Sequence, residues 1–245
     1  MGVREVALRY CNVAGDDVET TWDQARADLI IEGLPVRIPP SYRGQRSYPG
    51  LFWASKNRRM LVYESLLELE RLWMADFDAT VTAIATQPFQ VAGLDGGVRR
   101  VHVPDVLLTH HDDRVTVVDV KPKQLLNKPE VRAQFTWTQR LCQAKGWNYE
   151  VFTGGDAVIV RNIKTAALGR RPERLPAGLL DLARATVTAE VATLGDLLAR
   201  KPPGCDEAAW RAAVMALVWS GVIDADLTRP MNEATAVLIP EMASA

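Results

Sequence analysis

Apolar and polar residues near the start of the chain alternate or recur in ways that predict several short elements. Weak alternation predicts a strand in residues 3–10. An apolar end at Ile30, Ile31 and Leu34, with Gly33 as the stop, predicts a helix in residues 19–32. Three prolines then predict an extended connector. Residues 41–50 mix arginine, tyrosine and glycine, which predicts a loop that either touches a phosphate backbone or is a solvated linker.

The clearest helical pattern of this region occupies residues 58–75. Its apolar side chains recur near helical spacing at Leu61, Leu66, Leu69 and Trp73. Glu64 and Glu68 are one turn apart, so this helix would present both carboxylates on one face.

The centre of the chain predicts a mixed α/β core. Three strands are expected, in 81–91 with an interruption at Pro88, in 99–109 and in 114–120, and the polar turn between the last two predicts a hairpin. A helix in 130–145, ended by Gly146, and a strand in 147–153 follow. An order of helix, three strands, helix and strand is typical of a mixed sheet flanked by helices.

The last third of the chain predicts a second, mostly helical domain. A charged, proline-bounded segment at 170–176 favours a boundary that divides the chain into domains 1–170 and 171–245. The second domain shows helical patterns, with Thr193 as a candidate N-cap and Gly221 as a candidate C-cap, and a terminal extended pair. Three helices (177–192, 194–201 and 206–220) and a β-hairpin (222–239) predict a winged-helix-like module.

Composition places the chain among ordinary globular proteins, with 48% hydrophobic and 24% charged residues. The longest uncharged apolar run, 212–219, is far shorter than the roughly 20 residues that span a bilayer. The first ten residues lack the apolar segment of a secretory signal. Cys11, Cys142 and Cys205 are odd in number and far apart, which predicts neither a disulfide framework nor a zinc site and favours the reducing cytoplasm.

The net charge of −1 conceals an asymmetry between the two parts of the chain. Residues 1–171 contain 23 basic and 20 acidic residues, whereas residues 172–245 contain 6 and 10. Because phosphate contacts dominate binding to nucleic acid, the acidic C-terminal part is the poorer DNA-binding candidate and suits protein docking better. A basic series runs from the third predicted strand into the following helix and is either a solvated face or a DNA track: Lys121, Lys123, Lys128, Arg132 and Arg140.

The candidate chemistry lies in two carboxylates and a lysine. Asp105, after Pro104, belongs to the first strand of the predicted hairpin, and Asp119 and Lys121 share one face of the second. Two carboxylates and a main-chain carbonyl form a hard oxygen site suited to Mg²⁺ or Mn²⁺. A lysine beside the metal orients and helps to deprotonate a water, or stabilises charge developing on phosphorus. Glu68 would complete or tune this ligand set.

Other interpretations stay open at this point. The hairpin carboxylates and lysine also fit a half-exposed ion pair, although the valines around Asp119 indicate a buried strand, where charges are costly unless paired or metal-bound. Glu64 competes with Glu68 as the helix carboxylate. Lys123 competes with Lys121, although Pro122 indicates that the strand ends before it. The three histidines, His102, His110 and His111, lack a metal-ligand spacing.

An ordered set of motifs between residues 41 and 153 resembles the TnsA-type endonuclease subunits of heteromeric transposases, which have PD-(D/E)xK, restriction-endonuclease-like folds. Four segments carry the resemblance: Ser65-Leu66-Leu67-Glu68, the run from Asp76 through Gln87-Pro88-Phe89, Pro104-Asp105-Val106-Leu107-Leu108, and Val118-Asp119-Val120-Lys121-Pro122. By position, the resemblance implies an active site of Glu68, Asp105 and Lys121. The family allows glutamine two residues before the lysine; Asp119 stands there in this chain and completes the PD-DxK pattern.

The resemblance implies a metal-dependent endodeoxyribonuclease that cuts at transposon 5′ ends. Asp105, Asp119 and Glu68 would bind Mg²⁺, with Mn²⁺ able to substitute, and Lys121 would position the attacking water. The implied partners are double-stranded DNA, a DDE-type transposase (TnsB-like) and an AAA+ regulator (TnsC-like). Two alternatives are a stand-alone restriction or repair nuclease and a non-catalytic subunit that bridges transposase and regulator.

Overall fold

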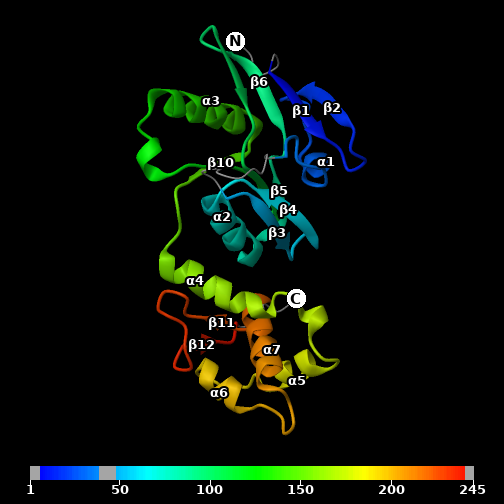
Figure 1. The fold of residues 1–245 in the computed structure, drawn as a ribbon, viewed down its shortest axis with the longest axis vertical. Helices are drawn as coiled ribbons and strands as arrows, with labels where there is room; N and C mark the ends of the chain where they lie inside the picture. The colour runs from blue at the N-terminus through cyan, green and yellow to red at the C-terminus, as the bar shows by residue number, and fades with distance from the viewer. Residues whose placement is uncertain (1–5, 39–47, 241–245) are drawn as a thin grey trace. The chain divides into compact units, whose positions relative to one another are not determined.

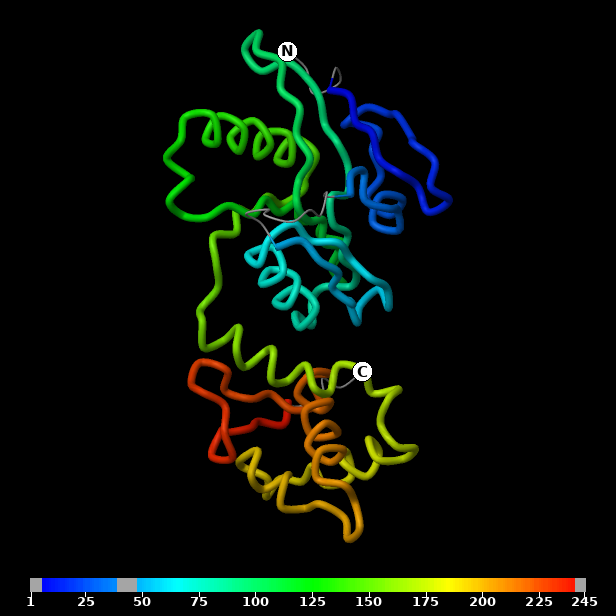
Figure 2. Tube along the Cα trace, viewed as in Figure 1, coloured from blue at the N-terminus to red at the C-terminus, as the bar shows by residue number. Residues whose placement is uncertain are grey.

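The computed structural model of the chain describes residues 6–38 and 48–240 (Figure 1). The chain divides into two compact units, residues 1–154 and residues 155–245, which we describe separately. The predicted loop at 41–50 lies mostly outside the described residues. Figure 2 traces the path of the chain through each unit.

A four-stranded mixed sheet organises the first unit, with the strand order β10-β9-β8-β5. Strands β8 (Val106–His110) and β9 (Val115–Val120) form an antiparallel hairpin, and β5 (Val81–Thr86) pairs with β8. Helix α3 (Pro129–Lys145) then leads to β10 (Asn148–Phe152), which runs parallel to β9. This confirms the predicted hairpin and the helix that follows it.

Both faces of this sheet are buried, because alternate residues of β9 enter different cores. Val117 packs with Trp137 and Leu141 of α3. Val118 packs in the other core, with Leu72 of helix α2 (Leu66–Phe77). A strand buried on both faces has a nearly continuous apolar sequence, which is the pattern of β9 apart from Thr116 and Asp119.

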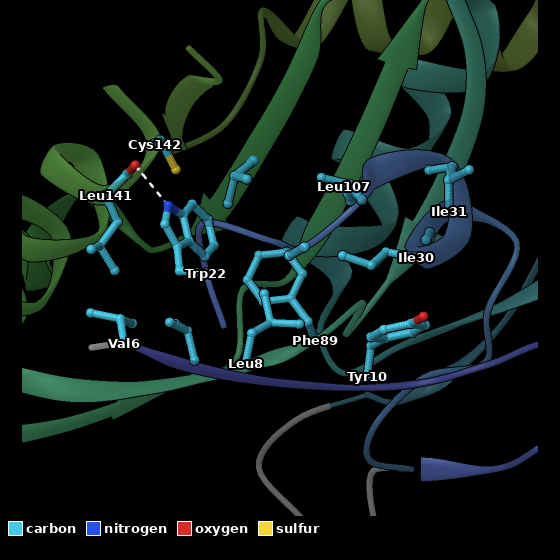
Figure 3. Close-up of a cluster of buried hydrophobic side chains, with 14 of the residues drawn as sticks. Val6, Leu8, Tyr10, Trp22, Ile30, Ile31, Phe89, Leu107, Leu141 and Cys142 are labelled. Carbon is cyan, nitrogen blue, oxygen red and sulfur yellow. Dashed lines mark hydrogen bonds between the residues drawn. The ribbon is translucent and has the colours of Figure 1, made fainter. Parts of the chain in front are cut away.

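A second four-stranded sheet, β2-β1-β6-β7, and the hairpin β3-β4 complete the first unit. Their bounds are β1 (Ala7–Cys11), β2 (Asp17–Thr21), β3 (Gly50–Ala54), β4 (Arg59–Tyr63), β6 (Gln90–Asp95) and β7 (Val98–His102), with helix α1 at Ala27–Ile31 and a 3-10 turn η2 at Lys123–Leu125. Trp22 lies in the core beneath this sheet beside Phe89, and its indole N–H donates to the Leu141 carbonyl oxygen (Figure 3).

Two helix predictions were wrong in their first halves. Residues 17–21 form β2, paired with β1 along its whole length, and only residues 27–31 are helical. Residues 59–63 form β4, paired with β3, and α2 starts after Ser65, whose side chain caps the helix. In both cases inter-strand hydrogen bonds, which local spacing does not reveal, outweigh the helical pattern.

The predicted strands 81–91 and 99–109 are each divided in two. The first breaks at Gln87-Pro88-Phe89, which confirms the interruption predicted at Pro88, whereas the second breaks at 103–105, just before β8, where no break was predicted. In each case the chain passes from one sheet to the other at the break, so that β5 and β8 belong to the sheet of β9 and β6 and β7 to that of β1. The predicted strand 147–153 is confirmed as β10.

The second unit starts earlier than the predicted boundary at residues 170 and 171. Helix α4 (Ala157–Ala166) and the 3-10 turn η3 (Ala167–Gly169) pack on helix α7 (Glu207–Trp219). A Cβ added to Gly169 would lie 2.0 Å from the Ala216 backbone nitrogen, so this approach requires glycine. The amphipathic face of α4 therefore belongs to the C-terminal core, and the division falls between Gly154 and Gly155.

The remaining elements of the second unit follow the predicted order, but the helix predicted in 177–192 ends at Ala185, and the predicted hairpin 222–239 pairs only two residues of each strand. They are the 3-10 turn η4 (Pro172–Arg174), α5 (Leu179–Ala185), α6 (Leu194–Ala199) and a two-stranded antiparallel pair of β11 (Asp224–Ala225) and β12 (Val237–Leu238). Thr193 caps α6 as expected, in a reciprocal capping box with Asp196. The winged-helix-like assignment stays a prediction. No helix in the described ranges, 6–38 and 48–240, is long and apolar enough to cross a bilayer.

Candidate active site

Asp105 lies directly before β8, where strand pairing holds both its backbone and its side chain. Its backbone N–H donates to the Val118 carbonyl oxygen (3.1 Å). Its carboxylate Oδ2 accepts a hydrogen bond from the Val120 backbone N–H at 2.6 Å. Asp105 therefore lies opposite the Asp119 end of β9, as the predicted hairpin requires.

Asp119 and Lys121 extend from the end of β9 toward one pocket. The Lys121 backbone N–H donates to the Phe152 carbonyl oxygen (2.9 Å), which ties this end of β9 to β10. The pocket has a volume of about 340 Å³, and Asp105, Asp119 and Lys121 all line it. Three of the predicted site residues thus share one cavity. The rest of its lining is Arg37, Gln90, Val101, His102, Val103 and Phe135.

The two candidate glutamates differ in position because α2 starts between them. Glu64 precedes the helix, and its carboxylate pairs with Arg37 (Oε1 to Nη2, 2.8 Å). Glu68 is buried in the first helical turn, and its Oε1 accepts from the Ser65 hydroxyl (2.8 Å) while its Oε2 accepts from the Glu64 backbone N–H (2.9 Å). The predicted shared helix face therefore does not exist, and Glu68 is the carboxylate directed inward.

The Asp105 carboxyl is desolvated and lies near two other carboxylates. Asp105 keeps some solvent contact through the pocket, but the atoms packed around it desolvate the carboxyl. This desolvation, followed by the charges of Glu68 and Asp119, raises the pKa of Asp105 well above its usual value. Burial also raises the pKa of Glu68, against the hydrogen bonds from Glu64 and Ser65. Asp105 is therefore the centre of an acidic cluster, because the charges of both Glu68 and Asp119 act on it.

Asp119 is already engaged by two side chains that the sequence reasoning did not assign to the site. The His102 ring Nε2 lies 2.8 and 2.9 Å from the two Asp119 oxygens, and the Tyr149 hydroxyl donates to Oδ2. Burial, with the neighbouring Asp119 charge, raises the pKa of the Tyr149 hydroxyl. No histidine spacing indicated His102; the signal would have been that β7 and β9 converge on one pocket, which only the tertiary structure shows.

The acidic cluster fits a hard divalent cation only in part. Desolvation disfavours the charged forms of Asp105 and Glu68, and a divalent cation would neutralise these charges. These two carboxylates would hold the cation. Against this, Asp119 is occupied by His102 and Tyr149. Moreover, among residues 6–38 and 48–240 no three His, Cys, Asp or Glu side chains are arranged as a metal-ligand group. Metal binding by Glu68, Asp105 and Asp119 stays a prediction.

The predicted basic series has exposed members beyond the pocket. Lys121 is half-buried, whereas Lys123, Lys128 and Arg132 are exposed on η2 and the start of α3. Arg140 is exposed too, but its guanidinium pairs with Asp95 (2.5 Å). Exposed lysines and arginines of this kind are the side chains that contact a phosphate backbone.

The raised pKa of Asp105 predicts a pH-dependent stability. Because the folded-state pKa lies above the unfolded value of about 4, folding favours the protonated carboxyl. The stabilisation is present at acid pH and is lost as the pH rises through the folded pKa. Asp105→Asn cannot ionise, so its melting temperature should exceed that of the wild type by a margin that grows from pH 4 to pH 8. Calorimetry in a chelator measures this margin, and a margin independent of pH would contradict the electrostatic reading.

Residues 78–154 match the family model described as "TnsA-like endonuclease N terminal". The matched segment contains Asp105, Asp119 and Lys121 and ends with the first unit, whereas Glu68 lies before it. No curated protein matches the chain. The match supports a TnsA-type endonuclease, and the mixed α/β architecture is consistent with a restriction-endonuclease-like fold.

Proposed function

We propose, from the premise that residues 78–154 belong to a TnsA-type endonuclease domain, that this protein is the metal-dependent DNA-cutting subunit of a heteromeric transposase. The observation that carries the proposal is the pocket that Asp105, Asp119 and Lys121 line together, with Glu68 close enough to raise the pKa of Asp105. An aspartate pair with a lysine, held at the adjoining ends of two paired strands, suits hydrolysis of a phosphodiester.

Each residue has a role in this proposal. Asp105 and Glu68 hold Mg²⁺ or Mn²⁺, which would polarise the phosphate and a water when bound. Asp119 becomes a third ligand of the cation if His102 and Tyr149 release its carboxylate. Otherwise it holds the side chains of His102 and Tyr149 in place beside the pocket. Lys121, the half-buried cation of the pocket, orients the attacking water or stabilises charge on the phosphate oxygens. The exposed lysines beyond it bind the flanking DNA backbone.

The cut falls at the 5′ ends of the transposon, while a DDE-type (TnsB-like) partner cuts and joins the 3′ ends. An AAA+ (TnsC-like) regulator would contact the acidic part of the second unit, residues 172–245, whose helices and β-pair we propose as a winged-helix-like docking module. To test this, the purified protein, the partner transposase and Mg²⁺ are mixed with transposon-end DNA. We expect nicks at the 5′ ends with Mg²⁺ or Mn²⁺ and none with EDTA. Cutting that persists in EDTA would refute metal dependence.

One observation favours a second candidate, a non-catalytic assembly subunit. Asp119 already accepts hydrogen bonds from two side chains, as a purely structural aspartate would. The same assay separates the candidates, because an assembly subunit supports 3′ joining but leaves the 5′ strands uncut. Cutting without the transposase would instead identify a stand-alone nuclease.

Glu68→Gln and Glu64→Gln form a matched pair for the helix carboxylate. Glutamine keeps one oxygen that accepts from the Glu64 backbone N–H, and its amide N–H donates to the Ser65 hydroxyl oxygen in place of the original bond, so the start of the helix is retained. We expect Glu68→Gln to lower the cutting rate about 100-fold or more, because an anionic oxygen near Asp105 is lost. Glu64→Gln breaks only the ion pair with the half-exposed Arg37 and should cut within about threefold of the wild type. The reverse ranking of the two rates would move the active carboxylate to Glu64.

A further inference from the structure

Gln87 connects two of the proposed catalytic carboxylates, although neither its sequence position nor the family match gives it a role. It follows β5, and its side chain is fully buried. Its backbone N–H donates to the Asp105 carbonyl oxygen (3.0 Å), and its side-chain Nε2 lies 3.4 Å from Glu68 Oε2. Gln87 therefore contacts both Glu68 on α2 and Asp105, which lies directly before β8.

The backbone of Gln87 is held in an unfavourable conformation. Its φ of +42° is in the left-handed region, and it precedes Pro88, a position that normally favours extended backbone. Within residues 6–38 and 48–240, the other non-glycine residues with positive φ are Arg58 and Asp113, and both are exposed in turns. Strain in a buried residue persists where the surroundings impose it, and it is concentrated at functional sites.

The side-chain carbonyl of Gln87 lacks the partner that a buried acceptor needs. Its Oε1 is buried and accepts no hydrogen bond from any residue in the described part of the chain. Such an acceptor is costly to leave unpaired, so it indicates an occupant that supplies a donor or a positive charge. The amide nitrogen of the same side chain already faces the Glu68 carboxylate, so Oε1 is the end left to meet that occupant.

We propose that Gln87 Oε1 is a neutral oxygen ligand of the divalent cation that Glu68 and Asp105 hold. This inference rests on the proposed function and extends its ligand set. Mg²⁺ and Mn²⁺ prefer carboxylate and carbonyl oxygens, which are the groups that these three residues supply. Gln87 Oε1 also supplies an oxygen in place of Asp119, whose carboxylate is hydrogen-bonded by His102 and Tyr149.

Gln87 could instead act only as a brace, through the hydrogen bond from Nε2 to Glu68. Two substitutions distinguish a ligand from a brace. Gln87→Met fills a similar volume but removes the oxygen and the amide, so it weakens cation binding under either role. Gln87→Glu keeps a side-chain oxygen and adds a negative charge. If residue 87 is a ligand, this change should strengthen cation binding. If residue 87 only braces Glu68, the new charge repels Glu68 and cation binding should weaken.

The test is calorimetric titration of the full-length protein with Mn²⁺ alone at pH 8, with no DNA present. We expect Gln87→Met to bind Mn²⁺ at least tenfold more weakly than the wild type, and Gln87→Glu to bind it as tightly or more tightly. Gln134→Met is the control, because Gln134 in α3 also has a buried amide atom, Nε2, without a partner in the described ranges. Its affinity should equal that of the wild type.

Each other outcome overturns the inference in a distinguishable way. Wild-type affinity in Gln87→Met, or tenfold weaker binding in Gln87→Glu, refutes the ligand role while the proposed metal-dependent nuclease stands. A wild-type protein that binds no Mn²⁺ refutes both. If Gln87→Met does not fold, the Gln87→Glu titration decides alone, since the two roles predict opposite changes for it.

Discussion

Asp105→Asn should reduce 5′-end cutting by on the order of 10³-fold or more, while 3′ joining by the partner transposase continues. The Asp105 carboxylate interacts electrostatically with both Glu68 and Asp119. Its negative charge should therefore contribute most to binding any cation that these three residues hold. Asparagine keeps a side-chain oxygen that accepts from the Val120 N–H, so the strand entry is preserved. The measurement is a strand-specific cleavage assay on transposon-end DNA.

The matched control is Asp112→Asn, in the exposed turn between β8 and β9. Asp112 pairs with Arg114 at the surface, so the same chemical change there should leave cutting within about twofold. A loss of activity in Asp105→Asn that accompanies a lower melting temperature would indicate misfolding. Because Asp105→Asn removes a repelling charge, we expect its melting temperature in a chelator to rise. The variant should therefore be more stable than the wild type but less active. Undiminished cutting by Asp105→Asn would refute the site.

Lys121→Met should lower the cutting rate by about 10²–10⁴-fold, the range for loss of a general acid–base group or of a charge that stabilises the transition state. Methionine keeps much of the aliphatic stem that the half-buried lysine packs into the pocket, so the change isolates the ammonium group. We expect DNA affinity to change little, because one phosphate contact contributes modestly. Single-turnover rates and binding isotherms separate the two effects.

Lys123→Met is the comparison for this variant. Lys123 lies two residues further on in η2 and is exposed, beyond Pro122. Loss of its charge should weaken DNA binding slightly and reduce its salt dependence, while the cutting rate at saturating DNA stays the same. If Lys123→Met loses the rate and Lys121→Met keeps it, the two roles are exchanged.

The elements with strong local signals were predictable. The turn between β8 and β9, the helix α3 with its left-handed Gly146 cap, and the capped helices α6 and α7 follow from turn residues, caps and apolar periodicity. The helical patterns in 19–32 and 58–75 were misleading, because part of each segment pairs with a strand whose position local spacing cannot indicate.

The sequence was sufficient to place Asp105, Asp119 and Lys121 together, because strand alternation and a short hairpin determine which side chains share a pocket. Tertiary structure decided the remainder. It separated Glu68 from Glu64, because Ser65 starts the helix between them, and it brought in His102, Tyr149 and Gln87 from strands and a strand break distant in sequence. It also assigned α4 to the second unit, because the apolar face of α4 packs on α7. Such contacts join residues far apart in the chain, so neither periodicity nor motif spacing records them.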